Sequence, residues 1–444
     1  MDAREVALLT LNACERQGGW SDGVLKKQIA AAGLDSRDAG LATQLCFGVI
    51  QNRILLDFYL SKFSNIPLRR LEGKVLQALR LGLYQMLFLT RIPHSAAVDQ
   101  SVDLTRTHCK NPRAPGMVNA ILRNLERSLD RLPTIPEDDP AEYYATLYSH
   151  PVWLVRELLE TLGSEGTAAF LQADNSQPPI TAMVNTVKTD LEGALEALQA
   201  EGVHGEPHPW LKNCLVLSRS GSLEELDAFQ KGLFYVQDPA SRLAVLALDP
   251  EPGSKVLDMC AAPGGKSFAA AIKMKDQGEI WSCDLHPHKK TLIQKGAQRL
   301  GLTCIRPQTA DGKVRRPEWE GGFDRVLVDA PCSGLGVIRK KPDIRFKDPE
   351  PLAGLPQVQS AILDNAAGYV RPGGVLVYST CTILERENRA VTDAFLAAHP
   401  EFSRERFLLP GPAGEVSEGQ ITLWPQVHGT DGFYICKLRK DGEA

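Results

Sequence analysis

Apolar residues recur with helical spacing through the first part of the chain. Leu41, Leu45 and Val49 lie four positions apart, which places them on one face of a helix. Dense apolar runs at 75–89 and 117–125 show little of the strict alternation that a half-buried strand would have. The pattern therefore predicts an all-helical region that ends near residue 131.

The middle of the chain has a different composition. Residues 131–147 are rich in proline and acidic residues, which is typical of a linker. Residues 148–235 combine a helical pattern at 152–162 with short strand-like runs at 181–187 and 214–217. This mixture predicts a small α+β module.

From residue 236 onward, strand, turn and helix patterns alternate. The predicted strands are 255–259, 279–284, 303–308, 323–329 and 375–379, and the predicted helices are 266–274, 286–300 and 357–369. A turn is expected at 371–374. Such alternation is typical of parallel β/α winding. We therefore expect an α/β fold, with a Rossmann-like doubly wound domain at 236–440, behind an all-α domain at 1–131 and a small α+β module at 148–235.

Composition favours a globular protein. The chain is 43% hydrophobic and 23% charged, and its apolar runs are far too short to span a membrane. Its charged N-terminus lacks the profile of a signal peptide, so the expected location is cytoplasmic. The ten cysteines are scattered without a Cys-x-x-Cys pair, so no metal site is predicted and the thiols should be reduced.

Charge is distributed unevenly along the chain. The formal net charge is −4, but residues 1–131 carry a net charge of +6 and the remainder −10. This imbalance indicates a polyanionic partner, such as a nucleic acid, for the N-terminal part. An ordinary solvated surface is the alternative.

Two cysteines follow predicted strands. Cys332 lies in the segment 329–334 (Asp-Ala-Pro-Cys-Ser-Gly), and Cys381 lies in 378–382 (Tyr-Ser-Thr-Cys-Thr). Ligands of doubly wound sheets collect beyond the carboxyl ends of the strands, so both thiols can face one substrate there. A deprotonated cysteine is a strong nucleophile, and the pair suggests covalent catalysis. The alternative is that both are small buried hydrophobic residues.

A glycine-containing turn lies between the first predicted strand of this domain and the helix that follows. Its residues are Cys260, Ala261, Ala262, Pro263, Gly264, Gly265 and Lys266. The glycines allow a ligand close to the backbone, and the helix start offers free N–H groups. The run lacks the spacing of a dinucleotide fingerprint or a phosphate loop, and a simple tight turn is the alternative.

Acidic residues follow three successive strands, at Asp284, Asp311 and Asp329. An acid after the second strand suits a ribose diol, and an acid after the third can accept from an exocyclic adenine amine. Each aspartate alone is typical of a helix cap or turn. Together with the glycine turn they favour a nucleoside-containing cofactor.

The segment that follows Cys332 is basic. It contains Arg339, Lys340, Lys341, Arg345 and Lys347. Phe346 lies among them and could stack on a base. We expect this loop to contact phosphate, with a solvated surface loop as the alternative.

The motifs around Cys260, Cys332 and Cys381 resemble those of S-adenosylmethionine-dependent RNA cytosine-5 methyltransferases, across residues 236–438. Residues 1–130 are similar to the NusB helical RNA-binding fold, notably in the segment 114–123. The fusion resembles the RsmB (Sun) family of bacterial 16S ribosomal RNA methyltransferases.

The resemblance implies a role for each site residue. The segment 260–266 would hold S-adenosylmethionine, with Asp284 at the ribose and Asp311 near the adenine. Asp329 would lie in the active site beside the cofactor. Cys381 would be the nucleophile and Cys332 would help to release the product.

The implied reaction is methylation of carbon 5 of a cytosine in 16S ribosomal RNA through a covalent Cys–RNA intermediate. Attack on carbon 6 makes the otherwise unreactive carbon 5 nucleophilic. An RNA-binding or assembly factor that acts through the NusB-like region is an alternative. A DNA cytosine methyltransferase is another, although there the Pro-Cys thiol would attack, and the additional Cys381 favours RNA.

Overall fold

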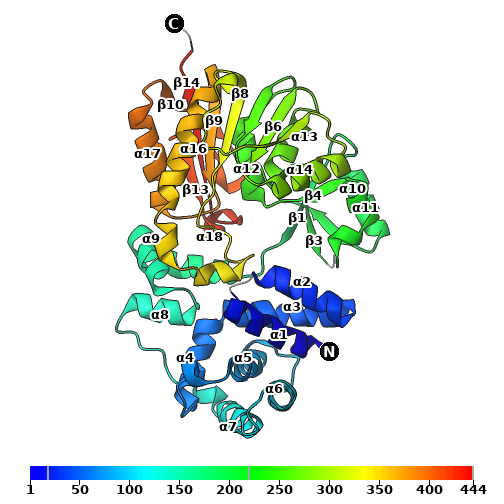
Figure 1. Ribbon diagram of the computed structural model, residues 1–444, viewed down its shortest axis with the longest axis vertical. Coiled ribbons are helices and arrows are strands. Elements are labelled where there is room, and N and C mark those ends of the chain that lie inside the picture. Colours follow the sequence, from blue (N-terminus) through cyan, green and yellow to red (C-terminus); the bar gives the residue numbers. More distant parts are fainter. Residues whose placement is uncertain (18–19, 219–220, 443–444) are drawn as a thin grey trace. The chain divides into compact units, whose positions relative to one another are not determined.

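The computed structural model describes residues 1–17, 20–218 and 221–442. It contains two compact units (Figure 1). The helical unit comprises Met1–Ser176 together with Lys341–Lys347, and the sheet-containing unit comprises Gln177–Lys340 and Asp348–Ala444. The division into three domains at 1–131, 148–235 and 236–440 remains our proposal.

The helical unit confirms the expected all-helical start of the chain. Its helices are α1 (Ala3–Gln17), α2 (Ser21–Ala32), α3 (Ser36–Gln51), α4 (Arg53–Phe63), α5 (Gly73–Phe88), α6 (His94–His108), α7 (Ala114–Glu126), α8 (Pro140–Leu147) and α9 (Val152–Asp174), with short 3₁₀ turns at Leu68–Arg70 and Leu129–Arg131. Helix α5 is buried from Val75 to Met86. A helix that is buried on all sides must be surrounded by other elements, so α5 forms the centre of this unit.

The interpretation of 131–147 as a linker is wrong for its second half. Residues 140–147 form α8, because Pro140 occupies the first helical turn, where its missing N–H has no cost. The side chain of Asp139 caps the helix by accepting a hydrogen bond from the amide of Ala141, at 2.8 Å. The helix predicted at 152–162 is the first half of α9, which kinks at Gly163 (φ 67°).

The basic segment 341–347 is part of the helical unit, where Pro342–Phe346 forms a 3₁₀ helix. Arg345 is 1% exposed. Its guanidinium donates to the carbonyls of Gln51 (2.6 Å) and Ser149 (2.8 Å) and to the amide oxygen of Asn175 (3.1 Å). Burial lowers the pKa of Arg345 to about 10. The expectation that Arg345 contacts phosphate is therefore wrong, because its guanidinium is buried and its two terminal nitrogens donate inside the protein.

The sheet-containing unit begins with a small antiparallel sheet, ordered β2-β3-β1-β4. Its elements are β1 (Ile180–Val184), α10 (Leu191–Ala200), β2 (His204–Pro207), β3 (Cys214–Ser218), a 3₁₀ turn at Leu223–Glu225, α11 (Asp227–Gln230) and β4 (Phe234–Val236). This sheet and its helices form the predicted α+β module, whose own apolar core includes Ala182, Leu198 and Phe234.

The larger sheet is ordered β10-β14-β9-β8-β5-β6-β7, with β13 paired to β14. Its strands are β5 (Lys255–Asp258), β6 (Glu279–Asp284), β7 (Ile305–Thr309), β8 (Phe323–Asp329), β9 (Val370–Thr380), β10 (Phe402–Arg404), β13 (Gln420–Leu423) and β14 (Phe433–Lys440). Strands β9, β8, β5, β6 and β7 are parallel, and β14 is antiparallel to β9. The chain reverses its direction of winding between β5 and β8, which is where ligands of such sheets bind.

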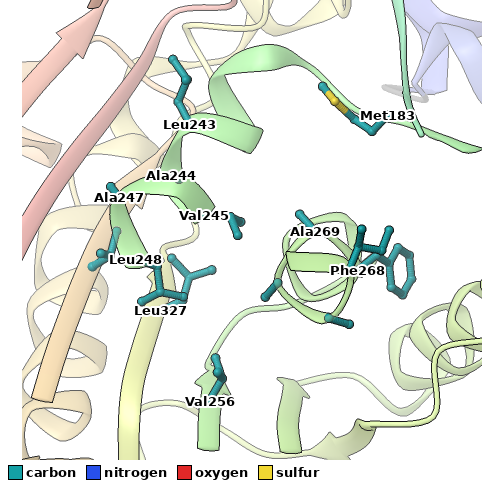
Figure 2. Packing of buried hydrophobic residues seen from close by; sticks show 14 of the residues in the cluster. Met183, Leu243, Ala244, Val245, Ala247, Leu248, Val256, Phe268, Ala269 and Leu327 are labelled. Carbon is teal, nitrogen blue, oxygen red and sulfur yellow. The ribbon is translucent and has the colours of Figure 1, made fainter. Parts of the chain in front are cut away.

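Helices cover both faces of this sheet (Figure 1). They are α12 (Pro239–Leu248), α13 (Gly265–Lys273), α14 (Pro287–Leu300), α16 (Leu355–Tyr369) and α17 (Arg389–Ala398), with shorter elements α15 (Pro349–Leu352), α18 (Pro425–His428), β11 (Phe407–Leu408), β12 (Glu415–Val416) and 3₁₀ turns at Pro317–Trp319, Glu385–Glu387 and Gly411–Ala413. Figure 2 shows Leu243 and Leu248 of α12, Phe268 of α13 and the strand residues Val256 and Leu327 in one apolar cluster. The neighbouring strand residues pack with α16 on the opposite face, as the alternation of side chains along a strand requires.

These elements confirm the predicted parallel β/α winding. The turn expected at 371–374 lies within the bounds of β9, where the register changes from Phe323 opposite Val370 to Arg325 opposite Val375. The extra residues on β9 make an irregularity at the predicted place. Among the described residues, no helix is both long and apolar enough to cross a membrane.

We predict that Arg345→Met destabilises the helical unit by about 3 kcal/mol, because three acceptors lose the hydrogen bonds of a buried guanidinium. Urea unfolding followed by circular dichroism measures this loss. The control is Lys341→Met in the same segment, where the side chain is exposed, and its effect should stay below about 0.5 kcal/mol. Equal stability of the two variants would contradict the anchoring role of Arg345.

Candidate active site

The turn between β5 and α13 forms one wall of the candidate site. The amide of Gly264 donates to the carbonyl of Ala261 at 2.7 Å, and Gly264 has a φ of 114°, a conformation that favours glycine. A Cβ at Gly264 would lie 2.4 Å from the Phe268 ring. Helix α13 starts at Gly265, so its first N–H groups point to the same turn.

This turn borders a cavity of about 210 Å³. Of the cofactor residues predicted from the sequence, Cys260, Ala261, Ala262, Pro263, Gly265, Lys266 and Asp329 line it. The structure adds Val236, Gln237, Asp238, Ser241 and Asp258 to its wall. In the sequence Asp238 looks like an ordinary helix cap, because it caps α12. Asp258 could have been noticed, because it ends β5 two positions before Cys260.

Asp258 is fully buried beside the cavity. Its Oδ2 accepts from the hydroxyl of Ser267 at 2.7 Å, and Ser267 accepts in turn from Ser282 at 2.7 Å. Its Oδ1 accepts no hydrogen bond from any residue that the structure describes. Burial raises the pKa of Asp258 to about 7. A cationic ligand in this cavity would find in Asp258 a buried acceptor with an unused oxygen.

An ion pair joins the turn to the end of β8. The ammonium of Lys266 lies 2.7 Å from Oδ2 of Asp329, and Oδ1 of Asp329 accepts from the hydroxyl of Ser379 at 2.8 Å. Burial disfavours the charge on Lys266, but the pair with Asp329 holds its pKa above the usual value. Ser379 lies on β9, two residues before Cys381. Asp329 therefore connects the cavity to the strand that precedes this thiol.

Asp284 and Asp311 lie at the same edge of the sheet but do not line the cavity. Asp284 is the last residue of β6 and accepts from the amide of His286 at 3.2 Å. Asp311 follows β7 and accepts from the amide of Lys313 at 2.9 Å. Their roles at the ribose and the adenine remain proposals.

The two thiols that were expected to share one site are in contact. The Sγ atoms of Cys332 and Cys381 are 3.3 Å apart. The hydrogen bond to Cys381, with burial as the next cause, raises the pKa of Cys332 well above its usual value. Cys332 therefore ionises less readily than an ordinary cysteine.

Direct hydrogen bonds fix the two thiol loops against each other. The amide of Gly336 donates to the carbonyl of Cys381 at 3.0 Å. The hydroxyls of Ser333 and Thr382 lie 2.7 Å apart, and both residues are fully buried. These contacts position the neighbouring cysteines.

A buried polar network that sequence reasoning missed supports both loops. Glu387 is fully buried, and its Oε2 accepts from the amide of Ser333 (2.9 Å) and the side-chain amide of Gln359 (2.8 Å). Asn388 donates to the carbonyl of Thr382 at 3.0 Å. The signal available in the sequence is only the polar run Glu385–Asn388, which also suits a surface turn.

A third loop packs onto the Cys332 loop. The amide of Gly432 donates to the carbonyl of Gly336 at 2.8 Å. Beside it, Asp431 accepts from Nε of Arg339 at 2.7 Å and from the ammonium of Lys340 at 2.8 Å, and both cations also pair with Asp238. The expectation that Arg339 and Lys340 contact phosphate is wrong, because the carboxylates of Asp238 and Asp431 already bind them.

We predict that Gly336→Ala separates the thiols, because the new Cβ would lie 1.9 Å from the carbonyl oxygen of Gly432. Oxidation with diamide, followed by peptide mapping, should link Cys332 to Cys381 at least about tenfold more slowly than in the unmodified protein. The control is Gly354→Ala, whose Cβ would meet no atom closer than 4.0 Å. Unchanged oxidation in Gly336→Ala would contradict this account of the loops.

Comparisons with known proteins agree with this arrangement. A family model described as 16S rRNA methyltransferase RsmB/F matches residues 245–439, the NusB family model matches 1–127, and a model of the ferredoxin-like domain of RsmF/B-like methyltransferases matches 150–224. The three models together span both units.

Relatives align over nearly the whole chain. The probable ribosomal RNA small subunit methyltransferase B of Bacillus subtilis is 40% identical, with 99% of each chain covered. Ribosomal RNA small subunit methyltransferase B of Klebsiella pneumoniae is 33% identical, over 92% of this chain and 91% of that one. The crystal structure of PH0851 superposes with a TM-score of 0.81 at 26% identity, with 99% of each chain covered. The chain therefore belongs to the RsmB family of ribosomal RNA small subunit methyltransferases.

Proposed function

We propose that this methyltransferase modifies carbon 5 of a cytosine in 16S ribosomal RNA, in the cytoplasm, through a covalent bond between Cys381 and the base. The observation that carries this proposal is the contact between the two thiols, 3.3 Å apart, beside a cavity suited to a cofactor. Transfer to a more nucleophilic position, such as an amine or a ribose hydroxyl, would need neither thiol.

The cofactor of the family is S-adenosylmethionine, which supplies an electrophilic methyl group when bound. The cavity residues fit its charges. The unused Oδ1 of Asp258 suits the ammonium group of the methionine part, and the first N–H groups of α13 suit its carboxylate. We propose that Asp284 and Asp311 contact the ribose and the adenine, from the ends of their strands.

Cys381 is the proposed nucleophile. Because the pKa of Cys332 lies well above its usual value, we assign the proton between the two sulfurs to Cys332 and the negative charge of the pair to Cys381. That thiolate would attack carbon 6 of the cytosine. The negative charge that the attack places on the ring would be neutralised by a proton taken from solvent at the ring nitrogen at position 3, and carbon 5 gains the electron density it needs to take a methyl group.

Asp329 is placed to support this step. With Lys266 at 2.7 Å, it is a carboxylate that accepts hydrogen bonds and does not donate them. It would therefore accept from the newly protonated ring nitrogen or from the exocyclic amine of the cytosine. Lys266 would keep its charge, because the ion pair raises its pKa.

Cys332 is proposed to act after methylation. Carbon 5 then carries both its hydrogen and the methyl group, and the hydrogen must leave as a proton before Cys381 can be expelled. Once Cys381 is bound to the base, Cys332 has lost its thiolate neighbour. Its thiol can then ionise to solvent and accept the proton from carbon 5. The carbon–sulfur bond to Cys381 breaks as the ring double bond reforms.

We predict that Cys332→Ser traps the protein on its RNA, because methylated cytosine remains bonded to Cys381. After incubation with S-adenosylmethionine and a 16S ribosomal RNA fragment, a slow band on a denaturing gel should appear. Cys381→Ala should form no adduct and lose cytosine-5 methylation. The matched control is the double variant Cys332→Ser/Cys381→Ala, and an adduct formed by it would contradict the assignment of the nucleophile.

We predict that affinity for S-adenosylmethionine rises with pH through about 7, as Asp258 ionises. Because burial raises the pKa of this acid, its charge is absent below about 7 and present above. Titration calorimetry between pH 6 and pH 8 should show a gain of roughly tenfold. Asp258→Asn, which keeps an oxygen for Ser267, should bind more weakly with a flatter profile. A profile unchanged by this substitution would exclude Asp258 from the ammonium site.

A further inference from the structure

A second cavity, of about 380 Å³, lies within the helical unit. It is bordered by residues of α1, α3, α4 and α5 and by the segment 341–347. Its volume is in the range of about 300–1,000 Å³ that is typical of sites for small ligands. None of the cofactor or catalytic residues discussed above contributes to it.

One wall of this cavity offers hydrogen-bond donors without acceptors. The guanidinium of Arg53 stacks over the ring of Phe346, with its carbon 3.5 Å from the ring centroid. Among the described residues, none accepts a hydrogen bond from this guanidinium. Its burial lowers the pKa of Arg53. A partly buried guanidinium has five N–H groups, which normally bind phosphate, carboxylate or carbonyl oxygens. A ligand that fills the cavity should supply such oxygens.

Another wall of the cavity has an acceptor without a donor. This acceptor belongs to Gln77, which is 2% exposed. Its amide nitrogen donates to Glu15 at 2.5 Å, but its Oε1 accepts no hydrogen bond from the part of the chain that the structure describes. The carboxylates of Glu15 and Asp343 also border the cavity. Arg80 cannot satisfy Gln77, because its donors bind Asp57 and Glu15. This side of the cavity should therefore bind N–H groups of a ligand.

Aromatic surfaces complete the site. Trp20 is 52% exposed at the cavity, and the ammonium of Lys347 lies 5.4 Å from its ring centroid. Exposed tryptophan and stacked arginine are surfaces on which single-stranded nucleic acids place their bases. The excess of basic residues in 1–131 favours a polyanion over an acidic or neutral peptide partner.

We propose that this cavity binds one unpaired guanosine of the RNA substrate. Guanine has two neighbouring donors on its Watson–Crick edge, N1–H and the exocyclic amine, which match the acceptors of Gln77 and Glu15. Its carbonyl oxygen or the adjoining phosphate matches Arg53, and the base stacks on Trp20. The inference rests on the proposed RNA substrate and adds to it a second contact point in the helical unit.

The test uses the full-length protein without S-adenosylmethionine. Fluorescence anisotropy measures binding of a fluorescein-labelled oligouridine that carries one central guanosine, compared with the same oligomer carrying adenosine. The unmodified protein should prefer the guanosine oligomer. Trp20→Ala and Arg53→Gln should each weaken its binding by about fivefold or more and remove the preference, as expected for loss of one stacked base.

The control is Arg106→Gln, which removes the same charge from an exposed position of α6 that does not border the cavity. Its affinity should fall by less than about twofold. Trp20→Ala keeps the test valid even if Arg53→Gln impairs folding, because the indole is exposed. Wild-type affinity and base preference in Trp20→Ala would overturn the proposal, as would an unmodified protein that does not distinguish the two oligomers.

These outcomes are separate from those of the proposed reaction. Binding is measured without methyl transfer, so a protein that fails to make 5-methylcytosine would contradict the proposed function and leave the guanosine preference standing. Conversely, a protein that methylates cytosine but shows no effect of Trp20→Ala on RNA binding would overturn only the guanosine site.

Discussion

The hydrogen bond from the amide of Gly336 to the carbonyl of Cys381 is the constraint on which the active site depends. It joins the loops after β8 and β9, which are neighbouring parallel strands. Gly432 closes this arrangement from the other side, where a side chain on either glycine would collide with the opposite backbone. Two thiols that are 49 positions apart in the sequence thereby come within 3.3 Å. Their contact in turn raises the pKa of Cys332.

Both cavities contain a buried oxygen atom without a donor among the described residues. Oδ1 of Asp258 borders the cavity beside the glycine turn, and Oε1 of Gln77 borders the cavity of the helical unit. An unpaired buried acceptor lowers the stability of the folded protein by about 1–3 kcal/mol. A ligand that donates to it recovers this free energy. We therefore propose that Oδ1 of Asp258 is preorganised to bind a cationic group and Oε1 of Gln77 to bind an N–H group.

The sequence was sufficient to predict the elements that depend on local pattern. Periodicity predicted the helices of the first unit, and the alternation of strands and helices predicted the parallel sheet. The positions of Cys332 and Cys381 after their strands predicted a shared site, because the ends of parallel strands meet at one edge. Their roles came from the family resemblance and remain proposals.

Features that depend on distant contacts could not be predicted in this way. Arg339, Lys340 and Arg345 have the sequence appearance of a phosphate-binding loop, but their partners lie about 90 to 300 positions away. Glu387 looks like a surface residue until the fold places Ser333 against it. A charged side chain is buried only when tertiary structure supplies its partners, and such partners leave no local signal.

The rates at which the two thiols are alkylated test directly which of them is the nucleophile. Iodoacetamide labelling of the unmodified protein near pH 7.5, quantified for each cysteine by mass spectrometry, reports which sulfur carries the thiolate. We expect Cys381 to be modified clearly faster than Cys332, whose pKa the neighbouring sulfur raises. Faster modification of Cys332 would assign the nucleophile to the other strand and contradict the proposed mechanism.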